Sequence, residues 1–227
     1  MRKNQRLSRV AAAAMMAALA VSVAACGSDT PQATPPSSSA AAPSPSSEAS
    51  AAGITTPKQA FGPACQQLPQ GGVPGSALKM AGQPVAAAAA TNPLLKTLTT
   101  AVQKAGIADT LNSAKAATVF APYDDAFTDL QQRIGPDRFN ALLADKNALG
   151  DILKYHVVVK RYDRAGLAAA GTVTTLQGGN LTITDAGDTM NIKDNANQTA
   201  HVLCGNLPTA NATVFVIDRV MMPKDDQ

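Results

Sequence analysis

The chain has 227 residues, of which 45% are hydrophobic, 4% aromatic and 15% charged, and its formal net charge is +3 at pH 7. Residues 1–25 contain four basic residues and no acidic one, so removing them lowers the formal charge by four, from +3 to −1. A chain without a basic surplus lacks the electrostatic footprint of a nucleic-acid-binding protein, and this class is excluded.

Residues 1–25 have the pattern of an export signal. An uncharged, alanine-rich run from Val10 to Ala25 follows four basic residues, Arg2, Lys3, Arg6 and Arg9. The run of 16 residues is shorter than the roughly 20 apolar residues that cross a bilayer as a helix. We therefore expect a removable signal peptide and no permanent membrane span.

Cys26 ends this segment, and the sequence Val23-Ala24-Ala25-Cys26 resembles the bacterial lipobox. The resemblance implies that Cys26 receives a diacylglycerol and becomes the first mature residue. Two acyl chains, such as palmitate, anchor a protein stably, whereas one chain is marginal. We expect a lipid-anchored protein on the outer side of a bacterial cell membrane, with a shed fraction. The alternative is an ordinary signal peptide with a chance cysteine.

Residues 26–55 are the predicted linker. Between Gly27 and Gly53, 20 of 27 residues are Pro, Ser or Ala, and none is aromatic or a larger aliphatic residue. Such a segment buries too little surface to offset the entropy lost on ordering. We expect a disordered spacer without modification. The alternative is a spacer that carries O-linked sugars on its Thr and Ser residues.

Residues 56–227 are predicted to form one domain that begins with helices. Asn92-Pro93 has the form of an N-cap followed by a first-turn proline, and apolar residues continue at helical spacing to Gly106. Two more helices are expected, one after Pro136 and one from Ala148 to Lys154.

The segment from Ala117 to Phe127 predicts a strand that turns directly into a helix. Its sequence is Ala-Thr-Val-Phe-Ala-Pro-Tyr-Asp-Asp-Ala-Phe. β-branched and aromatic residues suit a buried strand, and Pro122 ends the strand because it cannot donate to a sheet ladder. Asp124 or Asp125 is expected to cap the helix that follows.

Short apolar runs dominate the rest of the chain. Tyr155 to Val159 is expected to be a strand, because these residues are aromatic or β-branched around His156. Alternating runs separated by Gly, Asn and Asp predict further strands, at Val173–Leu176, Leu181–Thr184, Met190–Lys193, His201–Cys204 and Thr213–Val220. Helices followed by strands favour the α+β class.

Three segments resemble the signature blocks of fasciclin domains and follow the order of that family. They are Thr-Val-Phe-Ala-Pro at 118–122 with Asp-Ala-Phe at 125–127, Leu-Lys-Tyr-His-Val-Val at 153–158, and Ala-Thr-Val-Phe-Val-Ile-Asp-Arg-Val-Met-Met-Pro at 212–223. The resemblance implies a wedge-shaped β-sandwich flanked by several helices, and an adhesion or recognition module. Tyr123 departs from the family pattern, which has threonine after the proline, so the contact of that hydroxyl is not carried over.

In related domains, adhesion is attributed to an Asp-Ile pair near a helix and to the Tyr-His block. Asp151, Ile152, Tyr155 and His156 match these elements and are the candidate binding residues that the resemblance implies. The alternative is that Ile152 and Tyr155 are core residues of a helix-strand junction. His156 is expected to act through the fold, with a hydrogen-bond partner for each ring nitrogen.

Cys65 and Cys204 are the two cysteines that remain once Cys26 is lipidated. A lipobox, a linker and one domain, with cysteines at these two places, are similar to the mycobacterial fasciclin-domain surface lipoproteins and their secreted immunogenic relatives. An even set of cysteines in an exported protein favours a disulfide, and we expect Cys65 to bond Cys204. A reactive thiol pair, the competing hypothesis, needs a Cys-x-x-Cys motif or an electropositive niche, and neither is visible.

The sequence contains no Gly-x-Ser-x-Gly, Gly-x-Gly-x-x-Gly, phosphate-loop or His-Glu-x-x-His motif. His156 and His201 lie in separate apolar patterns, where a lone histidine is more often a hydrogen-bonded core group than a metal ligand. We therefore predict no enzyme activity, no metal and no cofactor.

Two functions remain open from the sequence. One is an anchored recognition module that binds a host cell-surface or matrix protein, as the resemblance implies. The alternative is an envelope protein that binds a small lipid, amphiphile or glycan in a groove of the sandwich. A flat apolar patch of several hundred Å² favours a protein partner, and a deep apolar pocket with a few polar groups favours a small ligand.

Overall fold

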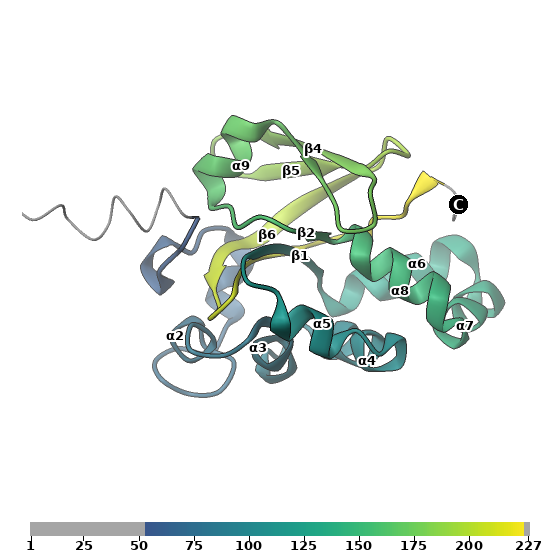
Figure 1. Cartoon of the computed structure of the whole chain (residues 1–227), viewed down its shortest axis with the longest axis horizontal. Coiled ribbons are helices and arrows are strands. Elements are labelled where there is room, and N and C mark those ends of the chain that lie inside the picture. Colours follow the sequence, from purple (N-terminus) through teal and green to yellow (C-terminus); the bar gives the residue numbers. More distant parts are fainter. Residues whose placement is uncertain (1–52, 225–227) are drawn as a thin grey trace, which may run out of the picture. The chain divides into compact units, whose positions relative to one another are not determined.

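The computed structural model describes residues 53–224 (Figure 1). The predicted signal, Cys26 and most of the predicted linker lie outside the described residues. Two short 3-10 helices, η1 (Pro57–Gln59) and η2 (Pro63–Gln67), open the described part. Its α-helices are α2 (Ala77–Met80), α3 (Val85–Thr91), α4 (Lys96–Ala105), α5 (Ala108–Ser113), α6 (Asp124–Ile134), α7 (Pro136–Ala144), α8 (Lys146–Tyr155) and α9 (Arg164–Ala170).

Seven strands of the described part form a mixed sheet in the order β2-β1-β7-β6-β5-β4-β3. They are β1 (Ala117–Pro122), β2 (Val157–Val158), β3 (Thr172–Thr174), β4 (Asn180–Asp185), β5 (Met190–Lys193), β6 (Thr199–Pro208) and β7 (Ala212–Ile217). β1 and β7 are parallel, and every other pair of neighbours is antiparallel.

The parallel pair β1 and β7 is buried along its whole length. Continuous apolar runs such as these are typical of strands that are covered on both faces. Val119 and Val214 belong to the buried cluster that contains helices α3 to α8. Phe120 and Phe215 belong to a second cluster with β3, β4 and β5, and their ring centroids lie 5.9 Å apart. Alternate side chains of the pair therefore face the two halves of the core.

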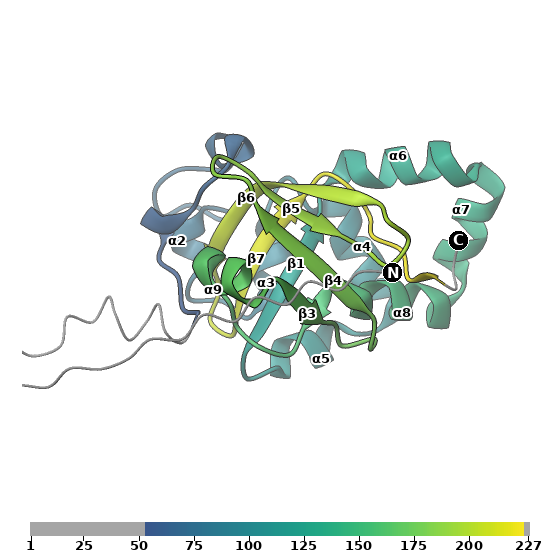
Figure 2. The ribbon, with the colours of Figure 1, turned by 90° about the horizontal axis from the view of Figure 1, so that it is seen from above.

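β6 joins the two halves of the sheet. Its first residues pair with β5 and its later residues pair with β7, with register irregularities on either side of Cys204. Irregularities of this kind let a strand bend. β4 and β5 consequently lie over β1 and β7, and the helices α3 to α8 lie on the other face (Figures 1 and 2). The predicted α+β class and the sandwich flanked by helices are confirmed.

The predicted start of the helix at Asn92 is wrong. α4 begins at Lys96, and Asn92 is the C-cap residue of α3, where its Oδ1 accepts a hydrogen bond from Leu94 N at 3.0 Å. The cap of α4 comes from another segment, since Asp124 Oδ1 accepts from Thr97 N at 2.7 Å. A carboxylate at a helix N-terminus is also stabilised by the helix dipole.

The same contact corrects the prediction that Asp124 or Asp125 caps the helix of its own segment. Tyr123 stands at the N-cap position of α6, and its side chain makes no capping hydrogen bond. Asp124 instead uses its carboxylate on α4 and its backbone N on Leu94 O, at 3.1 Å. The first signature block therefore ties α6 to α4.

The predicted strand from Tyr155 to Val159 is wrong over most of its length. α8 continues to Tyr155, His156 is its C-cap residue, and only Val157 and Val158 are extended. Tyr155 lies three residues after buried Ile152, so the two residues share one face of α8, and Tyr155 is fully buried with that face. Val159 is 66% exposed, and the last predicted strand likewise ends early, at Ile217.

Four helices, α2, α3, α5 and α9, are absent from the sequence prediction. α2 has four residues and α5 has six, which is too short for a clear period. α3 reads Val-Ala-Ala-Ala-Ala-Ala-Thr and α9 reads Arg-Ala-Gly-Leu-Ala-Ala-Ala. Alanine is the best helix former, but a run of alanines shows no apolar face to a periodicity search.

The segment before α2 is attached to β6 by a disulfide and by a β-bridge. Cys65 in η2 is bonded to Cys204 in β6, with their Cα atoms 4.9 Å apart. Next to it, Phe61 N donates to Gly205 O at 3.2 Å and Gly205 N donates to Phe61 O at 2.8 Å. A Cβ on Gly205 would lie 2.5 Å from the Phe61 ring, so only glycine lets the ring approach this closely. The ring then packs edge-on against Phe215.

Reduction of the disulfide is expected to lower the free energy of unfolding by as much as about 5 kcal/mol, because the bond connects residues separated by 139 positions. Urea unfolding with and without reductant measures the difference, and far-UV circular dichroism should stay unchanged. Cys65→Ala combined with Cys204→Ala serves as the control and should not respond to reductant. Equal urea midpoints for the oxidised and reduced protein would contradict the stabilising role.

Candidate functional site

The four candidate binding residues lie at the end of α8, and three of them are buried. Ile152 and His156 are each 2% exposed and Tyr155 is fully buried. Asp151 lies on the outer face of α8, where its Oδ1 is 2.9 Å from Lys154 Nζ in an ion pair. Of these four residues, Asp151 alone offers its side chain to solvent.

Tyr155 and His156 use their polar atoms within the fold. The Tyr155 hydroxyl donates to Asn180 O at 3.2 Å and accepts from Asn195 N at 3.1 Å. His156 Nδ1 lies 2.8 Å from Ile152 O, and His156 Nε2 accepts from Met221 N at 3.0 Å. Because Nε2 accepts, the imidazole is neutral and carries its proton on Nδ1. Complete burial lowers the pKa of His156 from 6.5 to about 4.

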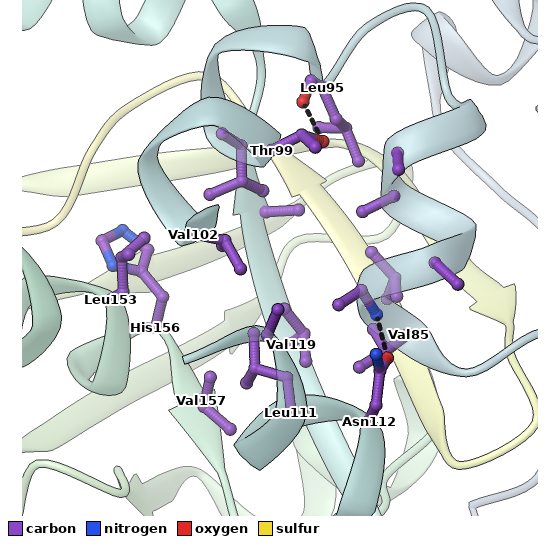
Figure 3. Close-up of a pocket in the computed structure, with 18 of the residues that line it drawn as sticks. Val85, Leu95, Thr99, Val102, Leu111, Asn112, Val119, Leu153, His156 and Val157 are labelled. Atoms are coloured by element: carbon purple, nitrogen blue, oxygen red, sulfur yellow. Dashed lines mark hydrogen bonds between the residues drawn. The ribbon is translucent and has the colours of Figure 1, made fainter. Parts of the chain in front are cut away.

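An apolar pocket lies between α3, α4, α5 and β1, with a volume of about 250 Å³. Figure 3 shows the side chains of Val102, Leu111 and Val119 pointing into this space. His156 and Leu153 lie on one side of it and Asn112 on the opposite side (Figure 3). The pocket satisfies the criterion that favours a small ligand, a concave apolar site with a few polar groups.

The sequence prediction missed most of this pocket, because α3 and α5 were not expected. Five residues of α3 line it, Val85, Ala86, Ala87, Ala89 and Ala90. The sequence signal for the pocket is the run of five alanines, because their small side chains leave volume unfilled where α3 packs against its neighbours. His156, a candidate binding residue because of the Tyr-His block, also lies in the wall of the pocket.

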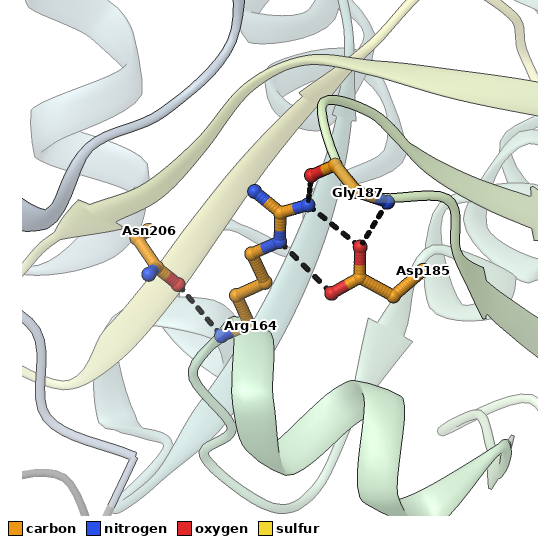
Figure 4. A network of polar contacts seen from close by, with 4 residues as sticks. All are labelled: Arg164, Asp185, Gly187 and Asn206. Carbon is orange, nitrogen blue, oxygen red and sulfur yellow. Dashed lines mark hydrogen bonds and ion pairs between the residues drawn. The ribbon is translucent and has the colours of Figure 1, made fainter.

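A polar cluster around Arg164 joins α9, β4 and β6 (Figure 4). Its Nε and Nη2 donate to the two carboxylate oxygens of Asp185 at 3.0 and 2.6 Å. This hydrogen-bonded pair raises the pKa of Arg164 and lowers that of Asp185. The guanidinium also lies 4.3 Å from the centroid of the Phe61 ring. Because these contacts satisfy its charge, we assign the cluster to the fold.

The exposed large apolar side chains of residues 53–224 come from several segments, and they are Ile54, Val73, Leu78, Val159 and Leu176. Single exposed apolar side chains are ordinary on folded proteins. Within the same residues, no three His, Cys, Asp or Glu side chains gather closely enough to hold a metal ion. None of the described helices is long and apolar enough to span a membrane.

Comparison with known proteins gives consistent results. Residues 93–223 match the family model of the fasciclin domain. The chain is 37% identical over 232 residues to the cell surface glycolipoproteins MPB83 of Mycobacterium bovis and MPT83 of Mycobacterium tuberculosis, which covers 95% of this chain and 96% of each relative. It is 39% identical over 171 residues to the immunogenic protein MPB70 of Mycobacterium bovis, covering 71% of this chain and 81% of that relative.

Among solved structures, the chain resembles a FAS1 domain pair from the insect cell adhesion molecule fasciclin I. The TM-score is 0.57 at 16% sequence identity, over 66% of this chain and 54% of that chain. At this identity the likeness concerns the fold alone.

Lowering the pH from 7 to 4 is expected to reduce the free energy of unfolding by about 3 kcal/mol through His156. The folded-state pKa is about 4 and the ordinary value is 6.5, so the unfolded chain binds the proton first. This stability is therefore present above pH 6.5 and is lost as the pH falls towards 4. Urea unfolding at pH 7, 5 and 4 measures the slope.

His156→Gln should remove this part of the pH dependence and should lower stability at pH 7. The control is His201→Gln, which makes the same change at the other histidine of the chain, an exposed residue. A His156→Gln protein that loses as much stability between pH 7 and 4 as the wild type would refute the assignment.

Proposed function

Because the chain belongs to the fasciclin domain family, we propose that it is a lipid-anchored cell-surface protein that presents one fasciclin domain for adhesion or recognition. The observation that carries this proposal is the identity of 37% with cell surface glycolipoproteins over 95% of this chain. The match of the fasciclin domain model supports an adhesion-like role at the cell surface, and the three signature blocks form the centre of the domain.

The proposed anchor is a diacylglycerol on Cys26, and the proposed spacer follows it to the start of the domain. Gly53 is the first described residue and is already buried, with its backbone O accepting from Thr213 Oγ1 at 2.8 Å. Thr213 belongs to β7, so the chain enters the fold beside the central strand. If extended at about 3.1 Å per residue, the spacer would reach roughly 80 Å, which would hold the domain well clear of the bilayer.

The proposed partner is a protein of a host cell surface or of an extracellular matrix. The burial of Ile152, Tyr155 and His156 argues that these residues support the domain and that contact with a partner is made elsewhere. Asp151 is the candidate residue whose side chain is exposed, and its ion pair with Lys154 is half solvent-accessible. A surface ion pair of this kind contributes little to stability and leaves both charges available to a partner.

Cys26→Ser is expected to release the protein from the membrane and to abolish adhesion by the bacteria that express it. The experiment compares bacteria that carry the wild-type chain, Cys26→Ser and Ser28→Ala, where the last leaves the cysteine intact. Detergent-phase partitioning measures anchoring, and attachment to host cells or matrix-coated wells measures adhesion. Wild type and Ser28→Ala should partition into detergent and attach; Cys26→Ser should do neither.

Equal partitioning of wild type and Cys26→Ser would overturn the anchor. Equal attachment of all three strains, or attachment that excess soluble protein does not compete away, would overturn the adhesion role while leaving the anchor intact.

A further inference from the structure

The pocket between α3, α4, α5 and β1 carries an inference that does not depend on the proposed adhesion role. Protein interiors are close-packed and contain few voids larger than a water molecule. A volume of about 250 Å³ exceeds the roughly 150 Å³ of an engineered apolar cavity that binds benzene. The pocket is therefore large enough for an organic ligand.

The pocket is held open by hydrogen bonds at its end near Asn112. Asn112 Oδ1 accepts from Ala86 N at 3.0 Å, and Asn211 Oδ1 accepts from Val85 N at 2.9 Å. The Asn211 amide nitrogen also donates to Leu111 O at 2.8 Å and Ala114 O at 3.0 Å. Two side-chain amides thus fix the start of α3 against α5 and β7. The alanine helix cannot slide into the empty volume without breaking these bonds.

The chemistry of the wall specifies an uncharged aliphatic ligand. Four of its 21 lining residues are polar and none is Asp, Glu, Lys or Arg. His156 uses both ring nitrogens within the fold, and the Thr99 hydroxyl donates to Leu95 O at 2.9 Å. Burying a charged group here would be costly, because nothing in the wall compensates it.

One atom of the Asn112 amide remains for a ligand. The Asn112 Oδ1 is occupied by Ala86 N, whereas its Nδ2 has no hydrogen-bond partner among the described residues. Asn112 is half-buried, and Gln103, another polar residue of the wall, is exposed. The amide therefore stands near the rim, where it can donate to an oxygen of a ligand whose chain lies deeper.

We propose that this pocket binds one uncharged aliphatic chain, with an ester or hydroxyl oxygen at Asn112 Nδ2 and the hydrocarbon against α3, α4 and β1. A water molecule occupies ~30 Å³ in the liquid, and a methylene group has a similar volume. At this volume per carbon, the cavity of about 250 Å³ holds roughly eight carbons. The chain can come from a membrane lipid or from a free amphiphile, and both share this chemistry.

The test is a titration of the full chain carrying Cys26→Ser with 1-octanol, followed by amide chemical shifts in ¹H–¹⁵N spectra. The Cys26→Ser change keeps detergent and the chain's own anchor out of the sample. Saturable shifts are expected around Ala89 and Asn112, with a Kd below about 1 mM, which corresponds to the modest affinity of a ligand of this size. Octanoate at pH 7 should bind at least tenfold more weakly, because its carboxylate is charged.

Two variants decide whether the pocket is the site. Ala89→Phe fills the pocket and should weaken octanol binding at least tenfold without a fall in Tm, whereas Ala141→Phe, on the exposed face of α7, should bind as the wild type does. Asn112→Asp keeps the acceptor for Ala86 N and removes the donor, so it should also weaken binding tenfold. Absence of saturation in the wild type, or unchanged affinity in both pocket variants, would overturn the proposal.

Vesicles of phosphatidylcholine distinguish the sources of the chain. Shifts at Ala89 and Asn112 on adding vesicles support capture of a bilayer lipid. Shifts with octanol alone support a free amphiphile.

Discussion

The parallel pairing of β1 with β7 is the constraint on which the rest of the structure depends. Six residues of each strand are in register, from Ala117 with Ala212 to Pro122 with Ile217, and all twelve are buried. Parallel neighbours need a long crossover connection. The segment from α6 to β6, which lies between β1 and β7 in the chain, forms this connection. The alternation of their side chains then divides the core, with valines towards the helices and Phe120 and Phe215 towards β4 and β5.

The other contacts of the fold attach to this pair. His156 O accepts from Phe120 N at 2.9 Å, and His156 Nε2 accepts from Met221 N. This one residue therefore joins the end of α8 to β1 and to the segment that follows β7. The disulfide fixes β6, the antiparallel neighbour of β7, to the segment before α2. Asn211, directly before β7, holds α3 and α5. The pocket thus inherits its position from the central strands.

The sequence predicts those parts whose signal is local. β1 and β7 are runs of β-branched and aromatic residues, and Pro122 is the last residue of β1, so both strands and the fold class could be inferred. Caps from distant segments could not: Asp124 caps α4, and Asn112 and Asn211 support α3, and no local pattern shows such pairs. The pocket was missed for a related reason. It results from alanines that leave volume unfilled, and the run of alanines has no period that reveals which face is buried.

Native-state hydrogen exchange tests the central role of the β1–β7 pair most directly. Amides of elements that open only on global unfolding exchange with the full free energy of unfolding, whereas peripheral elements exchange through smaller openings. The amides of Val119, Phe120, Val214 and Phe215 are expected to exchange most slowly in the domain and with one shared free energy of opening. Amides of β3, β4 and β5 should exchange through smaller openings. Protection of β4 and β5 that equals or exceeds that of β1 and β7 would contradict the central role of the β1–β7 pair.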